Sequence, residues 1–228
     1  MTNNKKVVLA LNEAFFSQFG PAKKYAKNKI ILEPGEEPNG VFFLKSGYIR
    51  LYLVSKEGKE LTLNIFKSGM FFPMIWTITE IPNVYFLETL TDVEILKAPR
   101  KEVLKFLEAN YSILFDLTKR VLSGLDGMTK LMDVLLSKNA YYQVCAVILM
   151  LGKRFGEENK NGYLSVEIPL THRLIGTLAS LSREATSREL EKLTREKIIE
   201  HTEHKLIIKK LAKLEEKFTA FAPDNFIF

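Results

Sequence analysis

The spacing of hydrophobic residues changes near Arg100, and this change constrains the fold more than any other feature of the 228-residue sequence. From about Lys29 to Ala98, short runs of β-branched and aromatic residues alternate with Gly, Pro, Asn and Ser, which is typical of strands joined by turns. After Arg100, the apolar residues recur with a helical period. The sequence therefore predicts an α+β protein whose β-rich part precedes a helical part.

The β-rich part contains one clear hairpin. In YIRLYLVSKEGKELTLNIF, residues 48–66, two alternating segments flank a turn at Gly58, where a positive φ is easily adopted. Repeated short strands at this spacing indicate a sandwich or a barrel. We expect a short helix at 12–19 to precede it.

The helical part begins with a seven-residue repeat. It predicts one helix from about Lys101 to Lys138, and some thirty residues of helix already span about 45 Å at 1.5 Å per residue, which is longer than a small barrel is wide. A seam of this kind lets two helices pack side by side, so we interpret it as the interface of a homodimer. The alternative is a helix that lies on its own domain's sheet. The predicted dimer residues are Leu114, Val121, Met128 and Leu135, with Leu117 and Leu131 in the companion register.

A second unit is expected to begin at Asn139, a good N-cap and hinge. Within it, residues 171–199 indicate a helix-turn-helix. We expect Thr171 to cap the first helix, Ser180 and Leu181 to make the turn, and Ser182 to cap the second helix. The apolar segments on both sides of a polar turn at 202–204 predict a β-hairpin, or wing, next to it.

The second helix of this motif is expected to present polar side chains on its exposed face. These are Arg183, Glu184, Ser187 and Arg188, with Glu189 and Lys192 also facing outward and Ala185, Leu190 and Leu193 facing inward. Arg can pair with guanine acceptors and Glu can accept from the cytosine amine, while Ser and Thr hydroxyls suit phosphates. The alternative is a solvated face with intrahelical pairs such as Glu184 with Arg188. Cations near the wing would add affinity that does not depend on base sequence.

These segments resemble the Crp/Fnr superfamily of bacterial transcription regulators. The resemblance covers nearly the whole chain, and LSREATSREL at 181–190 is its most specific part. It implies a double-stranded β-helix (jelly-roll) sensor domain at 1–100, a dimerisation helix at 101–138 and a winged helix-turn-helix at 139–228. It further implies base contacts from Arg183, Glu184 and Arg188, a backbone contact from Ser182, and phosphate contacts from Thr171, His172 and Arg173. The sequence departs from the family pattern at Leu174, Ser180 and Ala185, which bears on fine specificity.

The signal that such a sensor domain would detect is left open by the sequence. The family members that bind cyclic nucleotides use an Arg for the phosphate, whereas residues 69–92 contain no Lys or Arg, so cyclic-nucleotide binding is not expected. One cysteine, Cys145, cannot hold an iron–sulfur cluster, and the three histidines all lie in the C-terminal part, away from a sensor-domain haem. No cofactor is predicted. Phe72, Trp76 and Tyr85 belong to an aromatic segment that is either sandwich core or a pocket for an apolar small molecule; regulation without a ligand is the third alternative.

Partners and location follow from composition and resemblance. A net charge of +6 weakly favours an anionic partner, here double-stranded DNA. The resemblance further implies RNA polymerase and an unidentified small-molecule effector as partners. No membrane partner is expected, because no apolar run is long enough to span a bilayer, and we expect a cytoplasmic protein. An enzyme with a cupin-like sandwich is disfavoured, because residues 29–99 contain no histidine to bind a metal. The rival function is a ligand sensor whose helical domain docks a protein partner, and activation or repression stays open.

Overall fold

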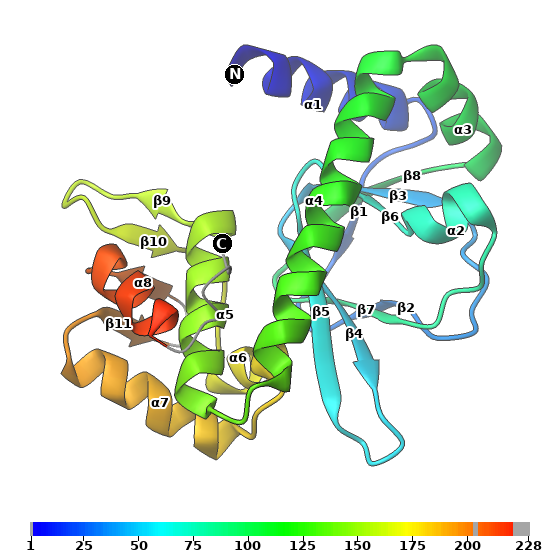
Figure 1. Cartoon of the computed structure of the whole chain (residues 1–228). Coiled ribbons are helices and arrows are strands. Elements are labelled where there is room, and N and C mark those ends of the chain that lie inside the picture. The colour runs from blue at the N-terminus through cyan, green and yellow to red at the C-terminus, as the bar shows by residue number, and fades with distance from the viewer. Residues whose placement is uncertain (1, 203–204, 221–228) are drawn as a thin grey trace. The chain divides into compact units, whose positions relative to one another are not determined.

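The chain divides into two compact units. The computed structural model describes residues 2–202 and 205–220. One unit comprises Met1–Leu53 and Leu63–Leu125, and the other comprises Val54–Thr62 and Asp126–Phe228. Figure 1 labels most of their elements. None of the helices described is long and apolar enough to cross a membrane.

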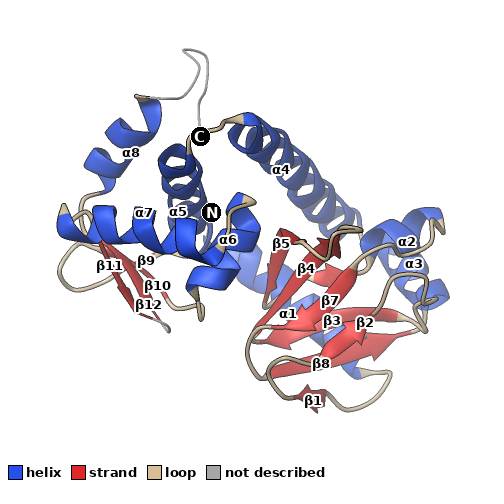
Figure 2. Cartoon of the chain, turned by 90° about the horizontal axis from the view of Figure 1, so that it is seen from below, coloured by secondary structure: helices blue, strands red, loops and turns tan. Residues whose placement is uncertain are grey.

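The first unit is built on two four-stranded sheets, with strand orders β1-β8-β3-β6 and β2-β7-β4-β5 (Figure 2). The strands are β1 (Lys23–Tyr25), β2 (Ile30–Leu32), β3 (Val41–Ser46), β4 (Tyr48–Val54), β5 (Glu60–Lys67), β6 (Phe71–Phe72), β7 (Phe86–Thr89) and β8 (Val93–Ala98). The predicted hairpin is confirmed as β4 and β5, with Gly58 at a φ of 76° in the turn. The α+β sandwich is therefore confirmed.

Strand β3 is buried on both of its faces. Phe42 and Leu44 point into a core that also takes Leu87 from the second sheet, so this core lies between the sheets. Val41 and Phe43 point to the other face, where a second core is formed with helices. Those helices are α1 (Thr2–Ser17), α3 (Arg100–Ala109) and the start of α4 (Tyr111–Leu136); a short helix, α2 (Met74–Thr79), follows β6.

Two helix predictions are corrected. The N-terminal helix spans Thr2–Ser17 rather than 12–19. The single helix predicted at 101–138 is two helices, α3 and α4, separated at Asn110, whose Nδ2 donates to the Phe106 carbonyl at 2.8 Å. An Asn side chain that bonds nearby backbone in this way competes with helix continuation. Because α3 buries Val103 and Leu107 in the sandwich core, it belongs to the sandwich unit.

The second unit contains a small sheet of order β11-β12-β10-β9 and four further helices. These elements are α5 (Ala140–Phe155), β9 (Glu157–Glu158), β10 (Leu164–Val166), α6 (His172–Ala179), α7 (Arg183–Arg195), β11 (Ile199–Thr202), β12 (Lys205–Ile208) and α8 (Leu211–Thr219). The Asn139 cap is confirmed, since its side chain accepts from the amides of Tyr141 and Tyr142. Cys145 is a free, buried thiol on α5.

Candidate nucleic-acid interface

Helices α6 and α7 form a helix-turn-helix with both predicted caps in place. Thr171 Oγ1 accepts from the Leu174 amide and Ser182 Oγ accepts from the Ala185 amide, each at 3.1 Å. Ser180 occupies the turn with a φ of 55°, and the Leu181 amide donates to the Gly176 carbonyl at 2.9 Å. These local bonds fix the start of α7 relative to α6.

The turn is tight because α6 has no side chain at Gly176. A Cβ built there would lie 2.9 Å from the Leu181 carbonyl oxygen and 3.0 Å from Thr186 Oγ1. Thr186 is fully buried, and its hydroxyl donates to the Ser182 carbonyl. Neither Gly176 nor Thr186 is predicted as a structural residue of the motif from the sequence, although a Gly inside a predicted helix is a signal for a packing role.

Helix α7 is anchored by one face and exposes the other. Arg183, Glu184 and Arg188 are exposed, as predicted, and Ser187 is half-buried. The buried residues on the anchored face are Thr186, Glu189, Leu190 and Leu193. The outward placement of Glu189 is therefore wrong: its position between Thr186 and Leu193 at helical spacing turns it inward, where Oε2 pairs with Lys192 Nζ at 2.6 Å.

The first turn of α6 brings together the predicted phosphate-binding residues. Thr171 and Arg173 are exposed and His172 is half-buried. The Arg173 guanidinium lies 2.7 Å from Glu60 Oε1, within the same compact unit. This pair must open or be shared if Arg173 is to bind a phosphate.

His201, on the wing strand β11, is packed against this turn. Its Nε2 lies 2.6 Å from the Leu170 carbonyl oxygen, and its ring stacks on that of His172 with centroids 5.1 Å apart. Burial lowers the pKa of His201 below its usual 6.5, although the hydrogen bond to Leu170 acts in the opposite direction. His204 lies outside the described residues, and no cluster of potential metal ligands is found in the part of the chain that the structure describes.

The His201 contact predicts a specific loss of stability. In His201→Phe the ring can still stack on His172, but the Leu170 carbonyl loses its donor, so we expect unfolding free energy to fall by about 1–2 kcal/mol in chemical denaturation. His201→Gln, which keeps an N–H donor, should recover part of that loss. Because the folded ring resists protonation, wild-type stability should also fall as the pH drops below about 6.5, and this fall should shrink in the Phe variant. Equal stability of wild type and His201→Phe would contradict this role.

At Ser180 a substitution is expected to increase the stability of the protein, in contrast to the loss expected at His201. A left-handed conformation costs an L-residue about 1–2 kcal/mol, and glycine largely avoids this cost. Ser180→Gly should therefore raise the unfolding free energy by about 1 kcal/mol, measured by denaturant titration. Ser180→Ala is the matched control, because it removes the hydroxyl and keeps the strain; a similar gain in both variants would rule out the backbone explanation.

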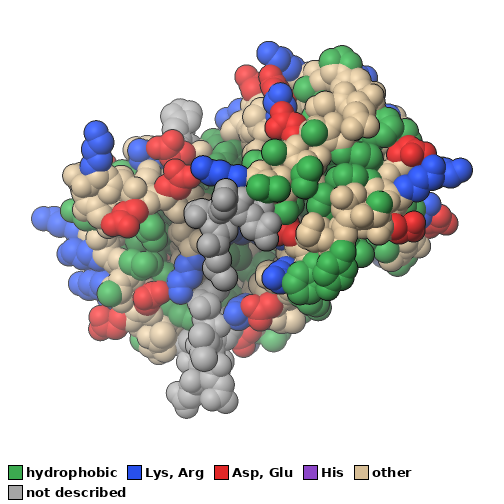
Figure 3. Space-filling model, turned by 90° about the horizontal axis from the view of Figure 1, so that it is seen from above, with side chains coloured by type: hydrophobic (Ala, Val, Ile, Leu, Met, Phe, Trp, Pro, Cys, Tyr) green, Lys and Arg blue, Asp and Glu red, His purple; other side chains and the backbone are tan. Residues whose placement is uncertain are grey.

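The wing is formed by β11 and β12, with Thr202 paired to Lys205 in their register. Its cations are partly neutralised, since Lys205 Nζ pairs with Glu167 at 3.1 Å and Lys209 pairs with Glu200. Figure 3 shows Lys and Arg side chains at the outer edge of the winged-helix unit, interspersed with acidic ones. Basic and acidic side chains are therefore mixed at this edge of the unit.

The predicted dimer residues on α4 lie on two different faces. Leu114, Val121 and Met128 are exposed, whereas Leu117 packs on the sandwich core, Leu131 is buried and Leu135 is half-buried. The exposed stripe is extended by residues that the sequence analysis did not select: Tyr111, Phe115, Leu122, Leu125, Met132 and Leu136. We call this set, together with Leu114, Val121 and Met128, the α4 stripe.

The aromatic residues proposed for an effector pocket lie in different surroundings. Phe72 is fully buried between the sheets and its ring lies 5.4 Å from both Phe42 and Phe66, so it is core. Trp76 packs against the other core cluster, 5.7 Å from the Arg100 guanidinium, and Tyr85 is half-buried. The placement of Phe72 removes it from any effector pocket.

Two family models match the chain, one over each part. The model of the cyclic nucleotide-binding domain matches residues 22–110, and that of the Crp-like helix-turn-helix domain matches residues 143–217. Together with the exposed face of α7, they define a transcriptional regulator with a helix-turn-helix DNA-binding domain.

The relatives agree with this class. The global nitrogen regulator of Nostoc sp. is 23% identical over 222 residues, covering 96% of this chain and 99% of its own. The anaerobic regulatory protein of Bacillus subtilis is 27% identical over 191 residues, covering 82% and 78%. The solved structure of a CooA mutant from Carboxydothermus hydrogenoformans superposes with a TM-score of 0.72 at 24% identity, covering 86% of each chain. The chain belongs to the Crp/Fnr superfamily.

Proposed function

We propose that the protein binds a near-palindromic DNA site as a homodimer, with one α7 helix in each of two major grooves. The observation that carries the proposal is the division of α7 into an anchored face and an exposed face with Arg183, Glu184 and Arg188 at its N-terminal end. Helices of this kind enter the major groove by their N-terminal end. Half-sites should lie about 34–36 Å apart, which is one helical turn of DNA.

In this proposal the residues divide into two roles. Arg183, Glu184 and Arg188 contact base edges, where Arg suits guanine and Glu suits cytosine. The residues for backbone contacts are Thr171, His172, Arg173, Ser182 and Ser187. The α4 stripe supplies the homodimer interface, since a solvent-exposed row of large apolar side chains on one helix suits a second copy of that helix.

We further propose that the sandwich does not use a cyclic nucleotide as its signal. No Lys or Arg occurs at 69–92, and the nearby strand cation Arg50 is already bonded to Glu88, its Nε lying 2.8 Å from Oε2. A bound phosphate would need a cationic partner to offset its desolvation. Calorimetric titration with cyclic AMP and cyclic GMP should show no binding in the micromolar range; micromolar affinity for either would overturn this.

The first test is a selection of genomic DNA fragments with purified protein, followed by footprinting at two salt concentrations. A two-fold symmetric protected site whose affinity falls steeply with salt is expected. Absence of enrichment, with and without cell extract, would favour the rival in which the helical domain docks a protein.

Arg183→Ala tests base reading on the selected site. We expect a loss of about 1–3 kcal/mol on that site, little loss on random DNA, and relaxed preference at one base pair. Arg195→Ala is the matched control, because Arg195 is an exposed cation in the last turn of the same helix and should weaken both DNAs alike. Equal losses on specific and random DNA in Arg183→Ala would show that Arg183 binds phosphate only.

A further inference from the structure

The sandwich has a small pocket at the end where β1 and β2, the edge strands of its two sheets, lie. The pocket has a volume of about 130 Å³, and we call it the β1–β2 pocket. Three buried residues of the core between the sheets form its floor: Leu32, Phe42 and Ile95. The other lining residues are Lys23, Tyr25, Ile31, Glu36, Asn39 and Lys97. None of them belongs to segment 69–92 or is assigned above to DNA contact.

Two lysines on neighbouring strands line this pocket from the same face of the sheet. In the register of β1 and β8, Lys23 is opposite Ile95, and Lys97 follows Ile95 by two residues. Residues related in this way share one face and are diagonal neighbours, roughly 7–8 Å apart. Two ammonium groups are therefore brought together at the rim, and their mutual repulsion is relieved when an anion lies between them.

Lys97 is positioned by packing along its stem. A Cβ built at Gly40 would lie 2.8 Å from Lys97 Cε, so the missing side chain at Gly40 leaves room for the stem. Lys97 Nζ lies 6.0 Å from the ring centroid of Phe42, the residue opposite Lys97 in the register of β3 and β8. An aromatic ring attracts a cation but carries no net charge, so the positive charge of Lys97 stays uncompensated.

The two lysines form no ion pair within the part of the chain that the structure describes. Lys24, between them and the opposite face of the sheet, pairs instead with Glu94 at 3.5 Å. The lining contains one carboxylate, Glu36, whose Oε2 accepts from the Glu33 amide at 3.1 Å. The lining residues therefore have a net charge of +1, two lysines less one carboxylate.

Two further polar groups at the rim are available as donors. The Tyr25 hydroxyl and the Asn39 side-chain amide form no hydrogen bond with residues 2–202 or 205–220. With the two ammonium groups, they place donors from β1, β8 and the loop before β3 around one small space. A set of donors that lacks acceptors suits an anion with several oxygens.

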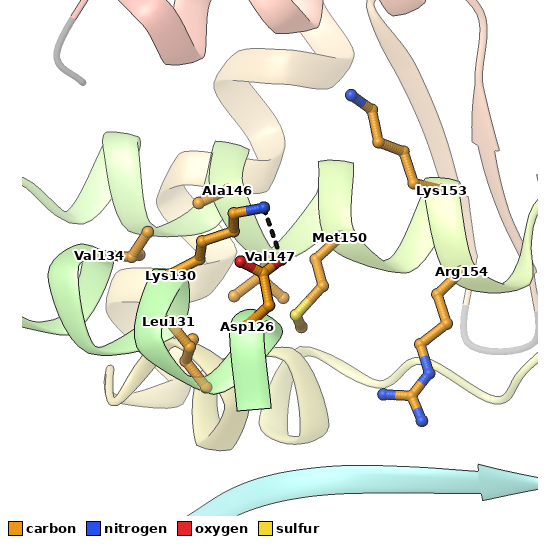
Figure 4. Close-up of a pocket in the computed structure, with 10 residues that line it drawn as sticks. Asp126, Lys130, Leu131, Val134, Ala146, Val147, Met150, Lys153 and Arg154 are labelled. Carbon is orange, nitrogen blue, oxygen red and sulfur yellow. Dashed lines mark hydrogen bonds and ion pairs between the residues drawn. The ribbon is translucent and has the colours of Figure 1, made fainter. Parts of the chain in front are cut away.

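The larger groove between α4 and α5, of about 230 Å³, differs in this respect (Figure 4). Its cations are already engaged, so it offers no comparable site for an anion. The contacts are Lys130 with Asp126 at 2.7 Å, Lys153 with Glu215 at 3.0 Å, and the Arg154 guanidinium with the Phe155 ring centroid at 5.1 Å.

We propose that the β1–β2 pocket binds a phosphate group, either as inorganic phosphate or as the head of a small phosphomonoester. Lys23 and Lys97 would bind the phosphate oxygens as point charges, and Tyr25 and Asn39 would donate hydrogen bonds. At about 30 Å³ for each water molecule, the pocket has room for roughly four water-sized groups, and a phosphate carries four oxygens.

The size of the pocket also separates this site from a nucleotide site. Its volume is below the roughly 300–1,000 Å³ of pockets for drug-sized ligands, so it cannot enclose a nucleoside. The proposal therefore agrees with the expected absence of cyclic-nucleotide binding. It is also independent of the proposed DNA binding, because the pocket and its test involve no DNA.

The experiment is a titration of inorganic phosphate into nitrogen-15-labelled full-length protein at constant ionic strength, followed by NMR. The Asn39 side-chain amide and the Gly40 backbone amide should shift in a saturable manner. Because solvent and salt screen the exposed ammonium groups, we expect a dissociation constant in the millimolar range. Nitrate, which is planar and carries one charge, should bind at least fivefold more weakly. Glycerol 3-phosphate distinguishes the two sources, since tighter binding than that of inorganic phosphate indicates a phosphomonoester, and equal or weaker binding indicates the free ion.

Four variants make the assignment specific. Lys23→Gln and Lys97→Gln should each weaken phosphate binding at least fivefold. Lys24→Gln is the matched control, because it removes the same charge from the next residue of β1, on the opposite face, and should change the affinity less than twofold. Glu36→Gln, which removes the carboxylate from the lining, should strengthen phosphate binding at least twofold.

Three results would each overturn the proposal. They are the absence of a saturable shift with phosphate, equal affinity for nitrate and phosphate, and equal losses in Lys23→Gln and Lys24→Gln. The last would show that phosphate is attracted by surface charge in general rather than bound in the β1–β2 pocket.

Discussion

Leu125→Lys is expected to convert the homodimer into a monomer and to lower affinity for the palindromic site by about 100-fold or more. Leu125 is 58% exposed and lies in the middle of the α4 stripe, with Leu122 one turn before it and Met132 two turns after it. A lysine here would place an ammonium group in an apolar helix-helix seam, where it has no partner and loses its hydration. Once the dimer is lost, the two half-sites are no longer bound together, and linked binding typically contributes 10²–10⁴-fold to affinity.

The measurement is molar mass by light scattering after gel filtration, followed by DNA titration. Ser123→Lys is the matched control, because it adds the same charge at an exposed position of the same helix outside the α4 stripe. It should remain dimeric and should bind DNA at least as well as wild type. A dimeric Leu125→Lys protein would show that the α4 stripe is not the interface, and a monomeric wild type would contradict the homodimer itself.

The α4 stripe also shows where sequence reasoning succeeds and where it stops. The seven-residue spacing of Leu114, Val121 and Met128 correctly predicts helix with an apolar face. Periodicity alone cannot say which of two apolar faces is covered by the protomer itself, and α4 has two. Leu117 and Leu131, which share the period, are covered by other parts of the same chain. Which face of α4 is buried depends on contacts with elements that are distant in sequence, and a local sequence pattern does not contain that information.

In the DNA-binding motif, too, local features could be predicted from the sequence, whereas contacts between distant residues could not. Caps depend on one side chain and amides two or three residues away, so Thr171, Ser182 and Asn139 could be assigned from sequence. The burial of Glu189 could not be predicted from the sequence, because a charged residue on a polar helix is assumed to face water. His201 could not either, since its partners, Leu170 and His172, lie about thirty residues away and are brought close only by the fold.

Gly176→Ala is expected to disrupt the helix-turn-helix through a single methyl group. The added Cβ would lie 2.9 Å from the Leu181 carbonyl oxygen and 3.0 Å from Thr186 Oγ1. Neither atom can retreat easily: the carbonyl is backbone of the turn, and the Thr186 hydroxyl is buried and bonded to the Ser182 carbonyl. We expect α7 to move away from α6, with a loss of about 1–3 kcal/mol of unfolding free energy, the usual cost of overpacking.

Gly176→Ala should also weaken specific DNA binding strongly. Arg183 and Arg188 can read bases only if α7 keeps its position relative to the Thr171 end of α6, so specific affinity should fall more than tenfold while random DNA is affected less. Gly127→Ala is the matched control: the same methyl group is added where nothing lies within 4 Å, so it should raise stability by about 1 kcal/mol through helix propensity alone. Denaturant titration and DNA-binding measurements on Gly176→Ala and Gly127→Ala test these expectations. If Gly176→Ala were stabilised like Gly127→Ala, the close approach between α6 and the turn would have to be abandoned as the feature that positions the recognition helix.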